Sequence, residues 1–329
     1  MNLNIKNKKV AIIGAGISGL ILADKLSKIS DVRVFDKSRG IGGRMATRRV
    51  DNYHFDHGAQ FFTAQSEIFQ NFCQKAENDN IIERWMPKYA EISGDNVIFK
   101  DRFTSGKPYF VAKPQMNSLC KYLAKDINIE LNKKIEFVDY MNNKWLLKTE
   151  NEEFGDFDYL ILAIPSHQAA ELAPKSFKYF DLISKAKMLG CFSLMIGLEK
   201  ELKLDFDAAL VKDSIINWIS LNNSKPGRPN ATSLLVNSSN DWAESCIEDD
   251  LDSLKQQMLD QLSKIIDLDS DNINYSTLHR WRYANCVPRN GEKSLFDPDL
   301  KLGVCGDWLT SGKVENAFLS GIDLFQKIS

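Results

Sequence analysis

The amino-acid sequence predicts an α/β fold in which both ends of the chain form one unit and the middle contributes an inserted domain with an antiparallel sheet. Three observations predict it. A strand, a glycine-rich turn, a helix and a second strand follow one another between residues 10 and 35. A wholly apolar strand, Leu302–Cys305, lies near the other end. From about residue 166 to 280, shorter apolar segments separated by turns replace this pattern.

The N-terminal elements are the clearest. Val10–Ile13 is a short apolar run of strand type that ends at Gly14, Ile17–Ile29 has helical character, and Val32–Phe35 is a second apolar strand. A strand, helix and strand within about 30 residues form a βαβ unit. The sequence therefore predicts two parallel strands joined by this helix.

The remaining elements follow from apolar periodicity and turn residues. Helices are predicted at Ser66–Glu77, Met116–Lys125, Asp249–Ile266 and, near the C-terminus, Val314–Lys327. Short antiparallel strands are predicted within Ile92–Phe110, with turns at Ser93–Asp95 and Ser105–Pro108, and as a hairpin of Ile135–Val138 with Lys144–Thr149. Tyr159–Ala163 is a predicted buried strand, and an antiparallel sheet is predicted from Leu189–Leu198, Ile215–Leu221 and Ser233–Val236, with a loop at Asn223–Asn230.

These elements predict two interleaved domains. Segments 1–65, 111–165 and 285–329 are assigned to the first domain, which is discontinuous. Segments 66–110 and 166–284 are assigned to the inserted domain, where a substrate is expected to bind. A chain of 329 residues is long enough for two domains of ordinary size.

Composition excludes several classes of protein. The formal net charge is −2, which argues against a nucleic-acid binder held by bulk charge. The cysteine and histidine spacings match no metal or redox motif, so no metal is expected and the cysteines are interpreted as reduced core thiols. The apolar run Val10–Ala23 is shorter than the roughly 20 residues that cross a bilayer. A cytoplasmic protein with no membrane association is expected.

The turn after the first strand carries a dinucleotide-binding fingerprint. Gly14, Gly16 and Gly19 have the spacing GxGxxG between a strand and a helix. Gly14 permits the tight turn, Gly16 admits a pyrophosphate, and Gly19 allows close helix packing. Asp36 ends the second strand, where a carboxylate can accept hydroxyls of an adenosine ribose. This fingerprint leaves FAD and NAD both open, with a Rossmann-like domain in either case.

The next segment favours FAD. Gly42, Gly43 and Arg44 follow Asp36 after a short spacer, which resembles the segment after the second strand in flavoproteins of the amine oxidase and glutathione-reductase-like superfamily. This resemblance implies that the arginine adds charge-assisted hydrogen bonds to the pyrophosphate. Near the other end, Gly306-Asp307 ends a strand before a helix, which resembles FAD proteins of this fold. The resemblance implies that Asp307 accepts from the ribityl chain and that the positive N-terminus of the helix stabilises reduced flavin. The predicted FAD-binding residues are Gly14, Ala15, Gly16, Ile17, Ser18, Gly19, Asp36, Lys37, Gly42, Gly43, Arg44, Met45, Gln60, Ile135, Ala163, Pro165, Gly306, Asp307, Glu315, Asn316 and Ala317.

Several motifs together resemble one family. The segments GAGISGL, GIGGRMATRR, FDHGAQFF, HRWRYA and CGDWLTSGKVENAFLSG are similar to renalase-type FAD proteins of the flavin amine oxidase superfamily, in particular the bacterial group. The resemblance implies non-covalent FAD in a Rossmann-like domain and a substrate domain with an antiparallel sheet, as in p-hydroxybenzoate hydroxylase. It also implies an oxidase that moves hydride from 2- or 6-dihydro isomers of NAD(P) to flavin N5, with O2 reduced to H2O2 and NAD(P)+ as product.

The candidate catalytic residues lie in two of these motifs. His57 and Gln60 are expected to bond the flavin or the carboxamide of the substrate, and Arg282 to face the flavin or the substrate's phosphates. Trp281 and Tyr283 are candidates for a stacking wall, with ordinary core aromatics as the alternative. Hydride transfer from a dihydronicotinamide needs no general base, so the lack of a catalytic dyad is expected.

Three alternative functions stay open. A flavin amine oxidase acting on a small amine would carry the same cofactor motifs, often with a lysine near the flavin. A protein that uses FAD without turnover would also carry them. A hydroxylase is compatible with the fold alone. The chain has no CxxC pair and no second GxGxxG, so neither a disulfide reductase nor a separate site for NAD(P)H is indicated.

Overall fold

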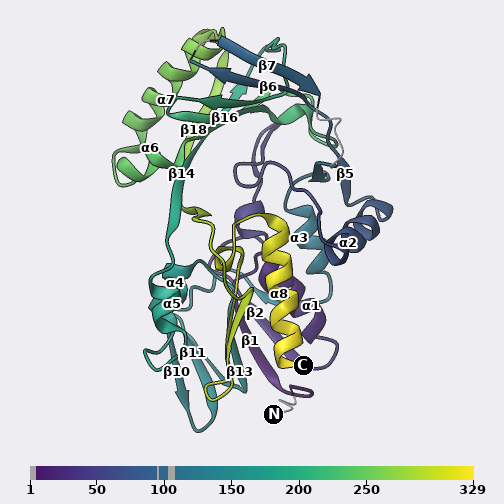
Figure 1. Ribbon diagram of the computed structural model, residues 1–329, viewed down its shortest axis with the longest axis vertical. Coiled ribbons are helices and arrows are strands. Elements are labelled where there is room, and N and C mark those ends of the chain that lie inside the picture. Colours follow the sequence, from purple (N-terminus) through teal and green to yellow (C-terminus); the bar gives the residue numbers. More distant parts are fainter. Residues whose placement is uncertain (1–4, 95, 103–107) are drawn as a thin grey trace. The chain divides into compact units, whose positions relative to one another are not determined.

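The computed structural model describes residues 5–94, 96–102 and 108–329, and these fall into two compact units (Figure 1). Unit 1 comprises Met1–Arg44, Cys120–Met188 and Cys286–Ser329. Unit 2 comprises Met45–Leu119 and Leu189–Asn285. The predicted turns at Ser93–Asp95 and Ser105–Pro108 lie in part outside the described residues.

Unit 1 is built on a six-stranded sheet in the order β19-β20-β13-β1-β2-β9. The strands are β1 (Lys9–Ile13), β2 (Asp31–Phe35), β9 (Asn128–Glu130), β13 (Tyr159–Leu162), β19 (Ser294–Asp297) and β20 (Leu302–Cys305). All neighbours are parallel except β19, which runs antiparallel to β20. The predicted βαβ unit is confirmed, since β1 and β2 are parallel and α1 (Ile17–Leu26) joins them. Helix α1 ends three residues before the predicted Ile29.

Helix α8 (Val314–Ile328) packs on α1. The backbones approach closely at Gly321, where a Cβ would lie 2.5 Å from the Ser18 carbonyl oxygen. The predicted hairpin is also confirmed, as β10 (Phe137–Met141) and β11 (Lys144–Lys148), and β12 (Glu153–Phe157) extends it. The same unit holds α4 (Ser166–Leu172), α5 (Phe180–Ser184) and the short helical turn η4 (Asp307–Leu309).

Unit 2 contains a seven-stranded sheet in the order β18-β14-β17-β16-β15-β6-β7. The strands are β6 (Lys88–Ser93), β7 (Asn96–Arg102), β14 (Met188–Leu198), β15 (Ala208–Lys212), β16 (Ile216–Leu221), β17 (Ser233–Ser238) and β18 (Ile273–Cys286). Strands β14, β17 and β16 pair antiparallel in turn, as the sequence predicts. Strand β15, which was not predicted, pairs antiparallel with β16 and parallel with β6.

The two faces of this sheet differ in chemistry. One face is apolar, with Leu194, Ile219 and Val236 in a buried cluster that includes Leu254 and Met258 of α7 (Leu251–Ile265). The alternate residues point to the other face because side chains along a strand alternate. That face carries serine, asparagine and tryptophan side chains, and the hairpin of β3 (Arg48–Val50) and β4 (Tyr53–Phe55) packs on part of it. A polar and aromatic sheet face opposite an apolar core is a candidate binding surface.

The other elements of unit 2 are α2 (Glu67–Asn78), β5 (Ile82–Arg84), β8 (Phe110–Ala112) and α6 (Asn240–Ser245). Helix α3 (Ser118–Leu123) spans the boundary of the two units and is shorter than the predicted Met116–Lys125. Strand β18 was not predicted. It lies at the edge of the sheet, and its partly exposed residues leave no clear apolar run.

The unit boundaries differ from the expected ones by more than one residue in three places. Residues 45–65 belong to unit 2, because Tyr53 and Phe55 pack with Met195 and Leu235. Residues 111–119 also belong to unit 2, while 166–188 belong to unit 1. Within unit 1, the Lys178 backbone N–H donates to the Asp297 carboxylate at 3.0 Å, a contact that no sequence pattern predicts.

Among the described residues, no helix is both long enough and apolar enough to cross a bilayer.

Candidate active site

The three fingerprint glycines of unit 1 have different surroundings. Gly14 has φ +111°, and a Cβ there would lie 2.4 Å from the Ala163 carbonyl oxygen. A Cβ at Gly19 would lie 2.2 Å from the Gly14 carbonyl oxygen. Because Gly14 and Gly19 lack a Cβ, the turn after β1, the first turn of α1 and the segment after β13 can pack against one another. A Cβ at Gly16, in contrast, would meet nothing within 4 Å, so open space lies beside this residue at the start of α1.

Asp36 holds the fingerprint turn. Its carboxylate accepts the Ala15 backbone N–H at 2.7 Å and the Ser38 backbone N–H at 2.8 Å, and the side chain is nearly buried. Each carboxylate oxygen keeps a further lone pair that can accept a ribose hydroxyl. The chain before β10 runs beside this residue, since Lys133 donates its backbone N–H to the Asp36 carbonyl. Ile135 is buried in that segment, just before β10 rather than in it as predicted.

The Gly-Gly-Arg segment packs on the fingerprint turn. The Gly42 backbone N–H donates to the Ala15 carbonyl at 3.0 Å, and a Cβ at Gly43 would lie 3.6 Å from the Gly16 Cα. The Arg44 guanidinium makes a bidentate ion pair with the nearly buried carboxylate of Asp307. Burial alone would lower the pKa of Arg44, but the Asp307 carboxylate outweighs it and raises that pKa.

The predicted residues near the C-terminus join the same region. The end of β13 reaches Gly14 through Ala163, and the Trp308 indole donates to the Ile164 carbonyl at 3.0 Å, just before Pro165. The Gly306 backbone N–H donates to Ser320 Oγ of α8 at 2.8 Å. The first turn of α8 holds Glu315, Asn316 and Ala317, as predicted. The structure therefore brings the predicted cofactor residues together in unit 1, except Met45 and Gln60, which belong to unit 2.

In unit 2, His57 forms a compact aromatic cluster with His279 and Trp281 of β18. The ring centroid of His57 lies 5.2 Å from that of Trp281, which stacks on it, and 4.9 Å from that of His279. The Trp281 indole donates to the His57 carbonyl at 2.8 Å. Burial lowers the pKa of both histidines to about 4, helped for His57 by His279 and for His279 by Arg48. Both rings are therefore neutral near pH 7.

The structure does not bring Arg282 to this cluster. Because residues alternate along β18, Arg282 points away from Trp281 and pairs with Glu248, with Nη2 and Oε2 2.7 Å apart. Arg280 follows the same alternation and lies over the Phe192 ring. Tyr283 is half-buried two residues beyond Trp281.

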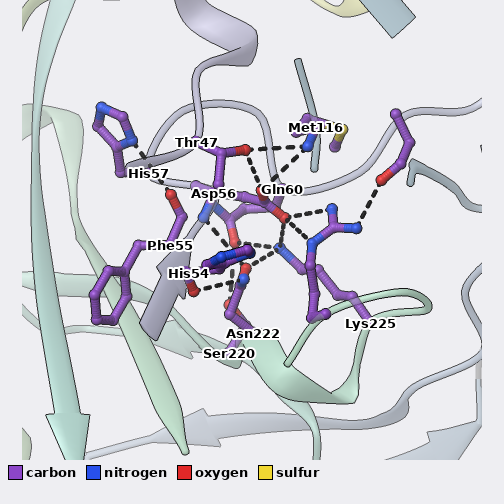
Figure 2. Close-up of polar contacts among 12 residues, drawn as sticks. Thr47, His54, Phe55, Asp56, His57, Gln60, Met116, Ser220, Asn222 and Lys225 are labelled. Carbon is purple, nitrogen blue, oxygen red and sulfur yellow. Dashed lines mark hydrogen bonds and ion pairs between the residues drawn. The ribbon is translucent and has the colours of Figure 1, made fainter. Parts of the chain in front are cut away.

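A buried charged network lies beside His57 (Figure 2). Asp56 is fully buried and accepts from Lys225 Nζ at 3.3 Å, from Arg228 Nη2 at 2.7 Å and from Thr47 Oγ1 at 2.6 Å. Lys225 also donates to Asn222 Oδ1 at 2.9 Å. Burial opposes ionisation of Asp56, but the two cations outweigh it and lower its pKa. Burial lowers the pKa of Lys225 to about 8.

Gln60 belongs to this network. Its amide nitrogen donates to the carbonyls of Asp56 and Gly58, and its oxygen accepts from Ser220 Oγ at 3.0 Å and from Lys225 Nζ at 3.2 Å. Sequence reasoning missed the network, because Lys225 stands 169 positions from Asp56 in a segment that reads only as a loop. The available signal was a carboxylate, Asp56, set among the aromatic residues Tyr53, Phe55 and Phe61.

All six cysteines are buried free thiols, as predicted. Burial raises the pKa of Cys305 to about 12. Within the described part of the chain, no cluster of His, Cys, Asp or Glu side chains could hold a metal ion.

Comparison with protein families agrees with this geometry. Residues 12–76 match the NAD(P)-binding Rossmann-like domain, and residues 85–324 match the family of flavin-containing amine oxidoreductases. The second match covers well over half of the chain. The chain belongs to the flavin-containing amine oxidoreductase family.

The individual relatives described here are distant in sequence from this chain. Mouse renalase is 29% identical over 176 residues, which are 50% of this chain and 49% of the renalase, so the match spans about half the length of that relative. Cyclohexylamine oxidase from Brevibacterium oxydans has the same fold, with a TM-score of 0.73, 13% identity and 98% coverage of each chain. A solved Exiguobacterium structure gives a TM-score of 0.80 at 12% identity, covering 98% of this chain and 99% of that one.

FAD is therefore the cofactor of this flavoprotein, and the residues of unit 1 fit it. The open space beside Gly16 would admit the pyrophosphate at the N-terminus of α1, where backbone N–H groups and the helix dipole favour anions. Asp36 would hold the adenosine ribose, and Arg44 and Asp307 would hold the pyrophosphate and the ribityl chain. When bound, FAD supplies the two-electron acceptor of this enzyme.

Changing Arg44 to lysine is expected to weaken FAD binding about 10-fold. Lysine keeps the charge but cannot make the bidentate pair that joins the Gly-Gly-Arg segment to Asp307. Titration of the apoprotein with FAD, followed by flavin fluorescence, measures the change. Arg84→Lys, at an exposed pair with Glu77 in unit 2, is the matched control and should bind FAD like the wild type. Equal affinity in all three proteins would contradict the role given to Arg44.

Proposed function

We propose that this protein oxidises a dihydronicotinamide dinucleotide, a 2- or 6-dihydro isomer of NAD(P), as the renalase-type resemblance implies. Two electrons and a proton leave the substrate as hydride and NAD(P)+ is the product. O2 takes up the two electrons, that proton and one proton from solvent to form H2O2. The similarity to mouse renalase over half the chain supports this substrate class.

The observation that carries the proposal is the neutral cluster of His57, His279 and Trp281. A dihydronicotinamide delivers hydride without losing a proton to a base, and its product ring is a cation. Two imidazoles whose pKa is about 4 are weak bases at neutral pH and do not repel a cation. The Trp281 ring adds a surface on which a nicotinamide can stack.

We assign His57 and Trp281 to direct contact with the substrate, and Tyr283 to the same stacking surface. Gln60 acts through the loop that carries His57, because its amide already bonds two carbonyls, Ser220 and Lys225. Arg282 is a weaker candidate, since its guanidinium is engaged by Glu248.

A flavin amine oxidase acting on a small amine is the second candidate. The family and the fold of cyclohexylamine oxidase favour it, and so does the buried lysine Lys225. That lysine, however, already donates to three acceptors, on Asp56, Gln60 and Asn222, which is the full capacity of an ammonium group. We therefore assign Lys225 a structural role within the buried network and not direct contact with a substrate.

Anaerobic stopped-flow reduction separates these candidates. The FAD-loaded protein is mixed with 6-dihydro-NAD, 2-dihydro-NAD, ordinary NADH or a panel of primary amines, and the visible flavin absorbance is followed. Rapid bleaching by a 2- or 6-dihydro isomer, with recovery and H2O2 on admitting air, is the expected result. Bleaching by amines alone would replace the proposal with the amine oxidase. A flavin that no donor reduces would indicate a non-catalytic FAD protein.

The rate of flavin reduction is expected to be flat from about pH 8 to about pH 5.5. An unperturbed histidine would titrate in this range, at about 6.5. The pKa of His57 and His279 is lowered to about 4, so both stay neutral, and the rate should fall only as the pH approaches 4 and they gain charge. Stopped-flow rates across this range test it. An inflection near pH 6.5 that disappears in His57→Gln would show that His57 titrates normally.

A further inference from the structure

We propose that Arg48 of β3 is the phosphate-binding residue of the substrate site, where it holds the phosphate that follows the nicotinamide ribose of the dinucleotide. This inference rests on the proposed function, because it assumes a nucleotide substrate. It goes further by assigning a residue of unit 2 to the charged part of the substrate, which takes no part in hydride transfer.

Arg48 is a partly buried cation whose side chain makes no hydrogen bond and no ion pair within the described part of the chain. None of its guanidinium nitrogens is buried, so the group is open to an incoming ligand. By contrast, the guanidinium groups of Arg44, Arg228 and Arg282 each pair with a carboxylate. An unpaired guanidinium presents five N–H donors in a planar fork, which matches the oxygen atoms of a phosphate.

The hairpin of β3 and β4 sets the position of Arg48. Arg48 lies directly opposite Phe55 in the hairpin register, so the two side chains share one face of the hairpin. The Phe55 ring stacks on the ring of Tyr275 of β18, with the centroids 5.9 Å apart. Because side chains alternate along β18, Tyr275 is on the same face of that strand as His279 and Trp281. Arg48 therefore lies on the side of the sheet that carries the neutral cluster.

The charge of Arg48 acts on both histidines of the neutral cluster. Burial is the main cause of the low pKa of His279, about 4, and the Arg48 guanidinium is the next cause. The same guanidinium lowers the pKa of His57, after burial and the neighbouring His279. A charge shifts the pKa of another group only from nearby, so Arg48 lies close to both imidazoles. This agrees with the position that the hairpin register gives it.

The charges beside the neutral cluster favour an anionic ligand over an amine. The carboxylate of Asp56 is already neutralised by Lys225 and Arg228. Arg48 therefore adds a positive charge that has no carboxylate partner among the described residues. This charge would repel the ammonium form of a simple amine, and it would also repel the nicotinamide cation that hydride transfer produces. A phosphate of the same substrate removes that repulsion, because it pairs with the guanidinium.

Removing the phosphates from the substrate tests the role of Arg48. The FAD-loaded wild type, Arg48→Gln and Arg48→Lys are compared on 6-dihydro-NAD and on 6-dihydronicotinamide riboside, which has no phosphate. We expect Arg48→Gln to lower kcat/KM about 10-fold for 6-dihydro-NAD, mostly through KM, because a charge-assisted hydrogen bond to a phosphate has this size. The riboside should react no more slowly than with the wild type. Arg48→Lys, which keeps the charge but loses the planar fork, should recover part of the loss.

Arg49→Gln is the matched control. Arg49 is the next residue of β3, is exposed and points to the opposite face of the hairpin, so this variant loses the same charge away from the cluster. It should act like the wild type on both substrates. An equal loss on both substrates in Arg48→Gln would show a merely structural role and overturn the proposal. Equal losses in Arg48→Gln and Arg49→Gln would show a general effect of charge and would overturn it as well.

Binding of inorganic pyrophosphate to the FAD-saturated proteins is the second measurement, made by isothermal titration calorimetry. It needs no turnover, so it decides on Arg48 even if no dihydronicotinamide proves to be a substrate. We expect pyrophosphate to bind the wild type and Arg49→Gln, and to bind Arg48→Gln about 10-fold more weakly. No binding to the wild type, or equal binding to all three, would overturn the phosphate site. A loss of FAD affinity in Arg48→Gln would also overturn it, because Arg48 would then face the cofactor.

Discussion

Replacing Gly16 with valine is expected to weaken FAD binding at least 100-fold, equivalent to about 3 kcal/mol, while the apoprotein stays folded. The reason is the contrast among the fingerprint glycines. At Gly16 a Cβ meets no protein atom within 4 Å and the backbone is extended, so the side chain enters only the space where the pyrophosphate would approach. FAD titration of the apoprotein and its thermal unfolding give the two quantities.

Valine substitutions at two further glycines serve as comparisons for Gly16→Val. Gly40→Val is the matched control, because a Cβ there also meets nothing within 4 Å but Gly40 lies outside the fingerprint. It should bind FAD normally. Gly14→Val should fail differently, by misfolding, since its Cβ would lie 2.4 Å from the Ala163 carbonyl oxygen at a positive φ. If Gly16→Val bound FAD as tightly as Gly40→Val, the cofactor would not lie at this turn.

Replacing Asp56 with alanine is expected to destabilise the protein by about 3–5 kcal/mol. The change leaves Lys225 and Arg228 buried without their carboxylate, and both side chains are fully buried. Chemical denaturation of the apoprotein at neutral pH measures the loss. Glu91→Ala, which breaks the exposed pair with Lys212, is the control and should change stability little.

A second variant distinguishes the effect of losing the carboxylate from the effect of leaving two buried cations without a partner. In Asp56→Leu combined with Lys225→Met and Arg228→Met, all three charges are gone, so much of the lost stability should return. If the triple variant were no more stable than Asp56→Ala, the network would act by its shape and hydrogen bonds and not by charge balance.

The same network predicts how stability depends on pH. The pKa of Asp56 is lower in the folded protein than its ordinary value of about 3.9. Its contribution is therefore complete above the ordinary pKa and is lost as the pH falls through the lower folded value. The pKa of Lys225 is also lowered, to about 8, so stability should rise with pH between about 8 and the ordinary lysine value of about 10.4. Lys225→Met should remove that rise.

Much of unit 1 could be predicted because its signals are local. The strand Leu302–Cys305, the start of α1 at Ile17 and the hairpin after Ile135 each follow from apolar periodicity, a glycine or a turn within a few residues. The fingerprint turn was predictable for the same reason, since it encodes a backbone shape that depends on its own glycines.

Unit 2 was harder to predict because its important contacts are distant in sequence. Strand β18 at the sheet edge has charged residues between its aromatic ones, so it lacks an apolar run. His57 and Trp281 were singled out by motif, but nothing in the sequence indicated that His279 would join them or that Arg282 would turn toward Glu248. Both outcomes follow from strand alternation once β18 is paired.

By itself, the sequence determined the α/β class, the dinucleotide-binding turn and the cofactor type, because each depends on residues close together in the chain. Only the tertiary structure decided where the buried charges and aromatic rings meet. Asp56 is neutralised by Lys225 and Arg228, and Phe61 meets Trp218, from segments more than 150 positions away. Burying a charge is favourable only beside its partner, and that partner is supplied by the packing of the whole unit.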